Sequence, residues 1–270
     1  MSDIKSVSII GCGWFGLPLA KKLLMAGLSV KGCKRTPEGV DEIRAMGVEA
    51  YRLDLQEDAP VPESLLQADC LIINLPPGIR RGDTDYLERL AKLKDALTTI
   101  PKRLLFISTT GVYPDLPAVL DEGDASAHSP GAAILLGAEA LFAGLNTTVV
   151  RFAGLVGPGR HPGRFFAGRT DVSGGALPVN IVHLDDCLSA VQALIAAPSI
   201  GRCYNLCAPG HPSKQTFYTE AARSGGFALP QFAADNGNGK VIDGSLICRE
   251  LGVHYRYADP LAMLVEAGAF

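Results

Sequence analysis

The chain has 270 residues, of which 47% are hydrophobic and 20% are charged, and its formal net charge is −3. This length predicts one or two domains with a sizeable core. The slightly negative charge excludes a general electrostatic attraction to nucleic acid or to an anionic membrane. No apolar stretch reaches the roughly 18 residues of a membrane span, and the polar residues 1–5 have no signal-peptide pattern. We therefore expect a cytoplasmic protein without nucleic-acid or membrane partners.

The seven cysteines are scattered through the sequence, and most of them lie in apolar surroundings. Cys203 and Cys207 have three residues between them, but no pair of histidines accompanies them. The pattern predicts buried thiols, with neither a disulfide framework nor a metal site.

The first structural signal is a strand, a glycine-rich loop and a helix. Residues 7–10 are a short apolar run of strand character, and the apolar residues between 17 and 24 have helical spacing. Between them, Gly11, Gly13 and Gly16 have the spacing G-x-G-x-x-G. In a dinucleotide-binding unit, these glycines allow a sharp turn, a close approach of phosphate to the backbone, and tight packing of helix on strand.

The backbone of this loop, including Trp14 and Phe15, is expected to hold the diphosphate of a dinucleotide. The N–H groups and the positive end of the helix dipole then face the anion. A glycine-rich turn without a ligand is the alternative, but the flanking strand and helix favour the cofactor site.

The end of the second strand bears on the choice of cofactor. The strand is expected over residues 28–33, and residues 31–36 contain no acidic side chain to bind a ribose hydroxyl. Lys34 and Arg35 lie there instead and suit a 2′-phosphate. This favours NADP over NAD, with ordinary solvated surface charges as the alternative interpretation of both side chains.

Two further strand ends supply cofactor candidates. A third strand is expected over residues 49–53, and Asp54 and Leu55 follow it; Asp54 could lie beside the adenine or simply belong to a loop. Residues 69–75 are a nearly continuous apolar run, which is typical of a buried parallel strand. Leu75 and Pro76 therefore fall at the carboxyl edge of the sheet, where ligands bind in open α/β folds.

The rest of this half completes the predicted fold. Arg80 follows in the same loop and could contact a substrate anion, the cofactor, or only solvent. A helix is expected over residues 83–99 and a strand over 102–108. Alternating strands and helices predict an α/β Rossmann fold with a doubly wound parallel sheet. We expect an NAD(P)-binding domain over residues 1–152 and a smaller substrate lobe over 153–270, interleaved with the sheet.

Residues 108–114 read STTGVYP and, with the glycine loop, carry a family resemblance. The chain resembles the extended short-chain dehydrogenase/reductases of the epimerase/dehydratase type. Counterparts of later family segments cover most of the second half, at residues 151–160, 180–187, 203–206 and 240–245. The resemblance implies that Thr109 hydrogen-bonds the reacting oxygen, and that helix 83–99 contributes to a homodimer.

One departure from this family concerns its catalytic helix. The family carries Tyr-x-x-x-Lys there, in which the tyrosine is the acid–base group. We expect that helix at about residues 131–145, with Gly131 and Leu135 at the two positions, and the segment contains neither tyrosine nor lysine. The glycine loop also departs from the family's usual G-x-x-G-x-x-G.

Replacement groups are expected in the Gly/Pro-rich segment 157–169. Arg160 and Arg164 suit an anionic substrate, and His161 is a candidate general acid or base. An exposed basic loop without a ligand is the alternative. Tyr113 is a second acid–base candidate, although a packing role suits it better.

Two functions therefore stay open. The first is an NAD(P)-dependent oxidoreductase or epimerase/dehydratase-like enzyme with an anionic small-molecule substrate. The second is an NADPH-binding redox sensor or regulatory module without turnover.

Overall fold

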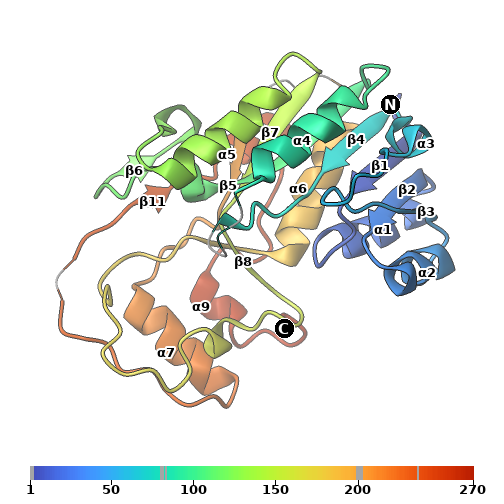
Figure 1. Cartoon of the computed structure of the whole chain (residues 1–270). Helices are drawn as coiled ribbons and strands as arrows, with labels where there is room; N and C mark the ends of the chain where they lie inside the picture. The colour runs from blue at the N-terminus through green and yellow to red at the C-terminus, as the bar shows by residue number, and fades with distance from the viewer. Residues whose placement is uncertain (1–2, 80–81, 83, 199–202, 236) are drawn as a thin grey trace. The chain divides into compact units, whose positions relative to one another are not determined.

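The computed structural model describes residues 3–79, 82, 84–198, 203–235 and 237–270 (Figure 1). The chain forms two compact units, and each takes segments from several parts of the sequence. The first unit comprises Met1–Val112, Ser126–Arg151 and Val191–Cys203, and the second comprises Tyr113–Ala125, Phe152–Ala190 and Tyr204–Phe270. A boundary between residues 152 and 153 stays a prediction.

A seven-stranded sheet has the strand order β10-β7-β5-β4-β1-β2-β3. The pairs β1–β2, β1–β4, β2–β3 and β4–β5 are parallel. The strands are β1 (Ser6–Ile10), β2 (Ser29–Lys34), β3 (Glu49–Arg52), β4 (Cys70–Ile73), β5 (Arg103–Thr109), β7 (Thr147–Phe152) and β10 (Cys203–Leu206). The chain runs outward from β1 through β2 to β3, then returns to add β4 and β5 on the other side. The predicted doubly wound fold is confirmed, and its strand order reverses between β1 and β4, where ligands bind in such sheets.

The longer helices agree with the sequence patterns. The helices are α1 (Gly16–Met25), α2 (Pro37–Ala45), α3 (Glu63–Leu66), α4 (Tyr86–Asp95), α5 (Pro130–Leu141), α6 (Leu184–Ala196), α7 (Lys214–Ser224), α8 (Leu246–Leu251) and α9 (Pro260–Met263). The helix predicted over residues 83–99 is shorter at both ends. The family segment expected at residues 151–160 begins inside β7, which starts at Thr147.

The core of the first unit explains why its strands are so apolar. All four residues of β4 are buried, because helices cover the sheet on both faces. Helices α4 and α5 pack side by side (Figure 1). The rings of Phe106 in β5 and Phe142 after α5 stack with centroids 5.5 Å apart. The apolar side of α4 faces the same core, through Tyr86, Leu90 and Leu93.

The second unit has a core of its own, built around α7 and α9. Val156, Ile181 and Phe217 are buried there, together with Tyr257 and Met263. Two small parallel sheets belong to this unit: β8 (Gly154–Val156) with β9 (Ile181–His183), and β6 (Val119–Leu120) with β11 (Val241–Ile242).

Within the described part of the chain, none of the helices combines the length and the apolar character needed to cross a bilayer. All seven cysteines carry free thiols, and five of them are buried.

Candidate functional site

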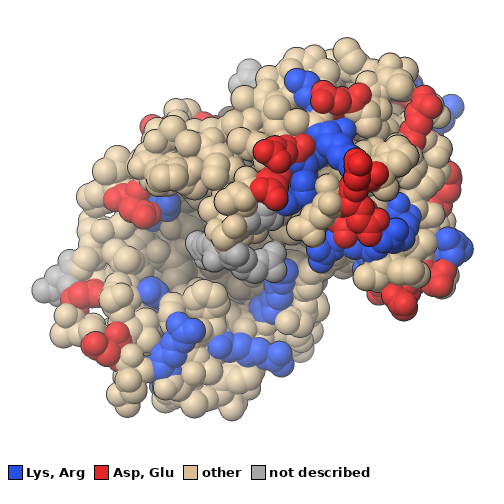
Figure 2. Space-filling view, viewed as in Figure 1, with Lys and Arg blue, Asp and Glu red and all other residues tan. Residues whose placement is uncertain are grey.

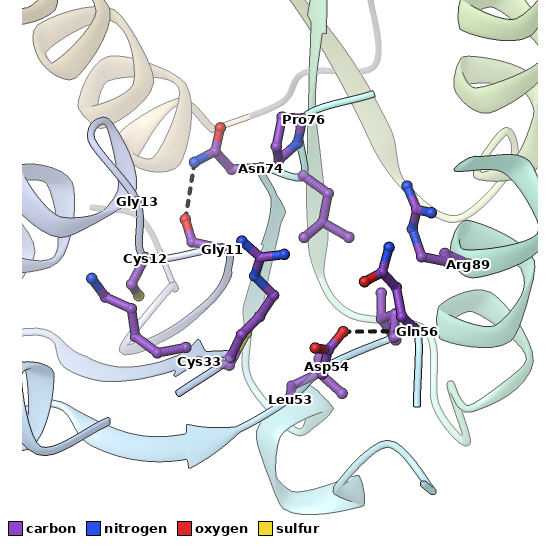
Figure 3. A pocket seen from close by; sticks show the side chains of 14 residues that line it. Gly11, Cys12, Gly13, Cys33, Leu53, Asp54, Gln56, Asn74, Pro76 and Arg89 are labelled. Carbon is purple, nitrogen blue, oxygen red and sulfur yellow. Dashed lines mark hydrogen bonds between the residues drawn. The ribbon is translucent and has the colours of Figure 1, made fainter. Parts of the chain in front are cut away.

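Gly11 and Gly16 are required by packing at the turn from β1 to α1. Gly11 has a φ of +108°, and a Cβ added to it would lie 2.3 Å from the carbonyl oxygen of Asn74. A Cβ on Gly16 would lie 2.3 Å from the carbonyl oxygen of Gly11. The Asn74 side chain donates a hydrogen bond of 3.0 Å to that same Gly11 oxygen (Figure 3). The loop is therefore held rigidly by the strand end of β4.

Gly13 differs from these two glycines because no protein atom excludes a side chain there. A Cβ added to Gly13 would meet no heavy atom within 4 Å. The open space lies at the start of α1, whose first turn has no acidic side chain and whose N-cap residue, Phe15, makes no side-chain cap bond. A position that stays open at the positive end of a helix suits an anion. These residues therefore fit the diphosphate of a dinucleotide.

A cavity of about 350 Å³ extends from this loop across the strand ends (Figure 3). Most of the predicted cofactor residues line it, and so do several that sequence reasoning missed. The predicted residues in its wall are Gly11, Gly13, Lys34, Arg35, Asp54, Leu55, Leu75 and Pro76. Of the other predicted cofactor residues, Phe15 is buried in the core, Gly16 packs on Gly11, and Trp14 is half-buried outside the cavity lining.

The two basic residues after β2 have different surroundings. The Nζ atom of Lys34 lies 2.9 Å from Oε2 of Glu42, and its aliphatic stem packs against Gly39 of α2. Arg35 is exposed, and its carbonyl oxygen accepts a hydrogen bond of 3.1 Å from Nε of Arg52. Arg35 therefore lines the cavity as an exposed cation, whereas Lys34 is already ion-paired.

Asp54 belongs to the loop after β3, and its place beside an adenine stays a prediction. Its Oδ1 accepts a hydrogen bond of 3.0 Å from the backbone N–H of Gln56, as a loop aspartate does. It also lines the cavity beside Leu55. The hydrogen bond from Gln56 therefore holds the Asp54 carboxylate at the cavity wall.

Six lining residues were missed by sequence reasoning: Cys12, Cys33, Leu53, Gln56, Asn74 and Arg89. Cys12 and Cys33 are buried, and this burial raises their pKa values to about 11 and about 12. Both thiols stay protonated near neutral pH, so they are not nucleophiles. Cys12 also leaves no room at the neighbouring Gly32, where an added Cβ would lie 2.5 Å from the Cys12 sulfur.

Thr109 lies at the carboxyl end of β5 and is half-buried. Its Oγ1 accepts a hydrogen bond of 3.2 Å from the backbone N–H of Gly111. A Cβ added to Gly111 would lie 3.3 Å from Cδ1 of Leu135 and 3.5 Å from Cγ2 of Thr109. Leu135 belongs to α5, which contains neither tyrosine nor lysine. The helix therefore presents an aliphatic side chain beside Thr109, at the position predicted for the family's lysine.

A buried ion pair ties α5 to the sheet behind Thr109. Glu139 accepts hydrogen bonds from Nε and Nη2 of Arg151 at 3.0 and 2.7 Å. The hydroxyl of Ser108 donates to the same carboxylate at 2.5 Å. All three residues are buried. The network was not predicted, although a lone glutamate within an apolar helix was its sequence signal.

The surroundings of Tyr113 do not suit the acid–base role for which it was a candidate. Its side chain is completely buried, and its hydroxyl donates a hydrogen bond of 2.7 Å to Oδ1 of Asn205 within the second unit. The amide of Asn205 in turn donates to the carbonyl oxygen of Asp243 at 3.1 Å. A hydroxyl enclosed in this way joins segments of the fold and is not presented to a substrate.

His161 and the two arginines of the basic loop belong to the second unit. Nδ1 of His161 accepts a hydrogen bond of 3.1 Å from the Gly163 N–H, and the ring contacts Phe227 and Phe270. Burial, and then the nearby Arg164, lower the pKa of His161. Arg164 lies over the Phe227 ring at 5.6 Å, and Arg160 is exposed. The other predicted substrate residue, Arg80, lies outside the described residues.

The described residues contain no cluster of three or more histidine, cysteine or acidic side chains that could hold a metal ion.

The strand order and the glycine cradle define a Rossmann fold. Solved structures share it: a putative NAD-dependent epimerase/dehydratase from Methylobacillus flagellatus has a TM-score of 0.75 at 24% identity, over 96% of this chain and 95% of that one. UDP-glucuronic acid 4-epimerase from Bacillus cereus in complex with NAD has a TM-score of 0.76 at 18% identity, over 95% and 96%. At these identities, the likeness concerns the fold.

Sequence similarity gives the narrower assignment. Protein YeeZ of Escherichia coli is 42% identical over 279 residues, covering 97% of this chain and 100% of that protein. The chain therefore belongs to the YeeZ family. No family model matches the sequence.

Proposed function

We propose that this protein binds a nicotinamide dinucleotide in the cavity between Gly13 and Asp54 and uses it on an anionic small molecule. The observation that supports this most is the open space beside Gly13 at the start of α1. No protein atom there excludes a side chain, yet the residue is a glycine. Two of the solved structures with this fold are described as complexes with NAD.

NADP is the proposed form of the cofactor. β2 ends in Lys34 and continues with Arg35, so no carboxylate is available there for a ribose 2′-hydroxyl. The exposed Arg35 guanidinium suits a 2′-phosphate, because a planar fork of donors matches phosphate oxygens.

The bound cofactor would supply a hydride acceptor or donor, and the protein's own residues would orient the substrate. Thr109 can donate its hydroxyl proton to a carbonyl or hydroxyl oxygen, because Oγ1 only accepts a hydrogen bond from Gly111. The cations Arg160 and Arg164, which the second unit supplies, suit the anionic part of a substrate. In His161, Nδ1 accepts the Gly163 N–H, which leaves Nε2 as the atom for proton transfer.

A second candidate function is dinucleotide binding without turnover, as in a redox sensor. One structural observation favours it: Leu135 lies next to Gly111 and Thr109, where the family resemblance predicts a lysine. An aliphatic wall at this place offers no proton relay.

The test of dinucleotide binding compares the melting temperature of the parent with and without NADPH or NADH. Gly13→Ala is the informative variant, because its Cβ meets no protein atom yet enters the proposed diphosphate site. We expect the ligand-free variant to melt like the parent and to lose the shift with NADPH. A parent that neither coenzyme stabilises would refute the proposal.

The choice between the two functions is tested with NADPH and a panel of carbonyl compounds and sugar nucleotides. Loss of NADPH absorbance supports the enzyme, and tight binding without turnover supports the sensor.

A homodimer that forms through α4 stays a prediction, and light scattering would test it. Because Tyr86, Leu90 and Leu93 are buried in the unit's own core, such an interface would use the polar side of α4.

A further inference from the structure

Arg89 brings a third cation to the cavity from a different wall. It belongs to α4, whereas Lys34 ends β2 and Arg35 follows it. Figure 3 shows Arg89 and Gln56 on the side of the cavity that lies away from Gly13. Arg89 is half-buried, so its guanidinium is partly withdrawn from water. The cavity thus has a cation at the end most distant from the proposed diphosphate site.

The position of Arg89 is set by Tyr86, one turn earlier on α4. The Tyr86 side chain is only 3% exposed, and its hydroxyl donates a hydrogen bond of 3.2 Å to the carbonyl oxygen of Leu75. This bond ties the first turn of α4 to the loop after β4. Residues three apart lie on one side of a helix, so Arg89 is directed to the same cavity wall as Leu75.

The chemistry of this end of the cavity suits a flat, uncharged ring. Leu55 and Leu75 supply apolar surface, and the Asp54 carboxylate already accepts the Gln56 N–H. A guanidinium stacks on an aromatic face through its own plane and through the attraction of the cation to the ring. We propose that Arg89 packs its guanidinium on the adenine base of the bound dinucleotide, an inference that rests on the proposed function.

The surroundings of Arg89 favour a base over a phosphate. Arg89 also lines a second groove, to which Glu57, Asp58, Asp85 and Glu88 contribute four carboxylates and Lys92 a further cation. On the face shown in Figure 2, acidic and basic side chains are likewise intermixed. A phosphate dianion beside these carboxylates would be repelled, whereas an uncharged purine would not. The 2′-phosphate is therefore left to Arg35, on the other wall.

The experiment measures the affinities of Arg89→Ala for NADH, NADPH, 5′-ADP and nicotinamide mononucleotide by calorimetry. We expect the first three affinities to fall by a common factor of about 2 to 30, because a cation–π contact contributes on the order of 0.5–2 kcal/mol. The affinity for nicotinamide mononucleotide, which lacks adenine, should not change. Arg89→Lys should lie between the variant and the parent, because it keeps the charge but not the planar group.

The matched control is Lys92→Ala, which removes a cation from the same helix, in the acidic groove but outside the cavity lining. It should bind all four ligands like the parent. Unchanged affinities in Arg89→Ala would overturn the inference, and so would a loss confined to NADPH, which would place Arg89 at the 2′-phosphate. A parent that binds none of the ligands would instead refute the proposed function.

Discussion

Glu139 and Arg151 form a two-point ion pair inside the first unit, with N···O distances of 3.0 and 2.7 Å. The pair links the last turn of α5 to β7, and Ser108 adds a third hydrogen bond from β5. Because both charges are buried, removing one of them takes this charged partner away from the other.

We therefore expect Glu139→Ala to lower the free energy of unfolding by about 3–5 kcal/mol. Replacing both residues together, as Glu139→Leu with Arg151→Met, should recover much of that loss, because no unpaired charge then stays buried. Urea denaturation measures the change. The exposed pair Arg223–Glu220 is the control, and Arg223→Ala should unfold like the parent. A single variant as stable as the parent would contradict this account.

Coenzyme preference should depend more on Arg35 than on Lys34. The ion pair with Glu42 engages Lys34, whereas Arg35 is exposed at the cavity wall. We expect Arg35→Ala to weaken NADPH binding by about 10- to 100-fold, the usual range for hydrogen bonds to a charged group. NADH binding should change little. Titration calorimetry of both coenzymes decides, and a larger effect of Lys34→Ala would contradict the prediction.

Tyr113→Phe should affect stability and not chemistry. The substitution removes the hydroxyl that donates to Oδ1 of Asn205 and leaves that buried acceptor without this donor. We expect a loss of about 1–3 kcal/mol in the free energy of unfolding. NADPH binding, and turnover where a substrate is found, should equal those of the parent. A large fall in turnover at unchanged stability would return Tyr113 to the list of acid–base candidates.

Asp69 should make the protein sensitive to acid. Partial burial alone would raise the pKa of its carboxyl group, but hydrogen bonds from the N–H of Lys5, from Lys102 and from Ser6 outweigh burial and lower the pKa to about 2. Because the folded-state pKa lies below the unfolded value, the stabilisation is complete above about pH 4 and is lost as the pH falls toward 2.

Chemical denaturation at several pH values measures this effect with Asp69→Asn. The variant should be less stable at neutral pH and should lose less stability than the parent between about pH 4 and pH 2. Asp58→Asn, at an exposed position, is the control. An acid profile of Asp69→Asn that matches the parent's would contradict the assignment.

The parts of the site that were predictable are those that the local sequence determines. The turn at Gly11 and the packing of Gly16 follow from glycine spacing between a strand and a helix, and Asp54 follows directly after its strand. Each of these features is set within a few residues of chain.

The parts that could not be predicted depend on contacts between distant segments. Asn74 reaches Gly11 across 63 residues, and Arg89 reaches the cavity only because α4 is tied to the loop after β4. The pairing of Lys34 with Glu42 also needed the helix α2 in place. The packing role preferred for Tyr113 agrees with its burial, but no sequence pattern indicated the distant Asn205 that accepts from its hydroxyl.

The contact between Gly32 and Cys12 has a consequence for variation among relatives. The two positions lie on neighbouring strand segments, and the sulfur occupies the volume that a methyl group at position 32 would need. We therefore expect relatives with a larger residue 32 to carry a smaller residue 12, so that the two sites change together. An enlarged residue 32 should be better tolerated beside a smaller residue 12 than beside cysteine.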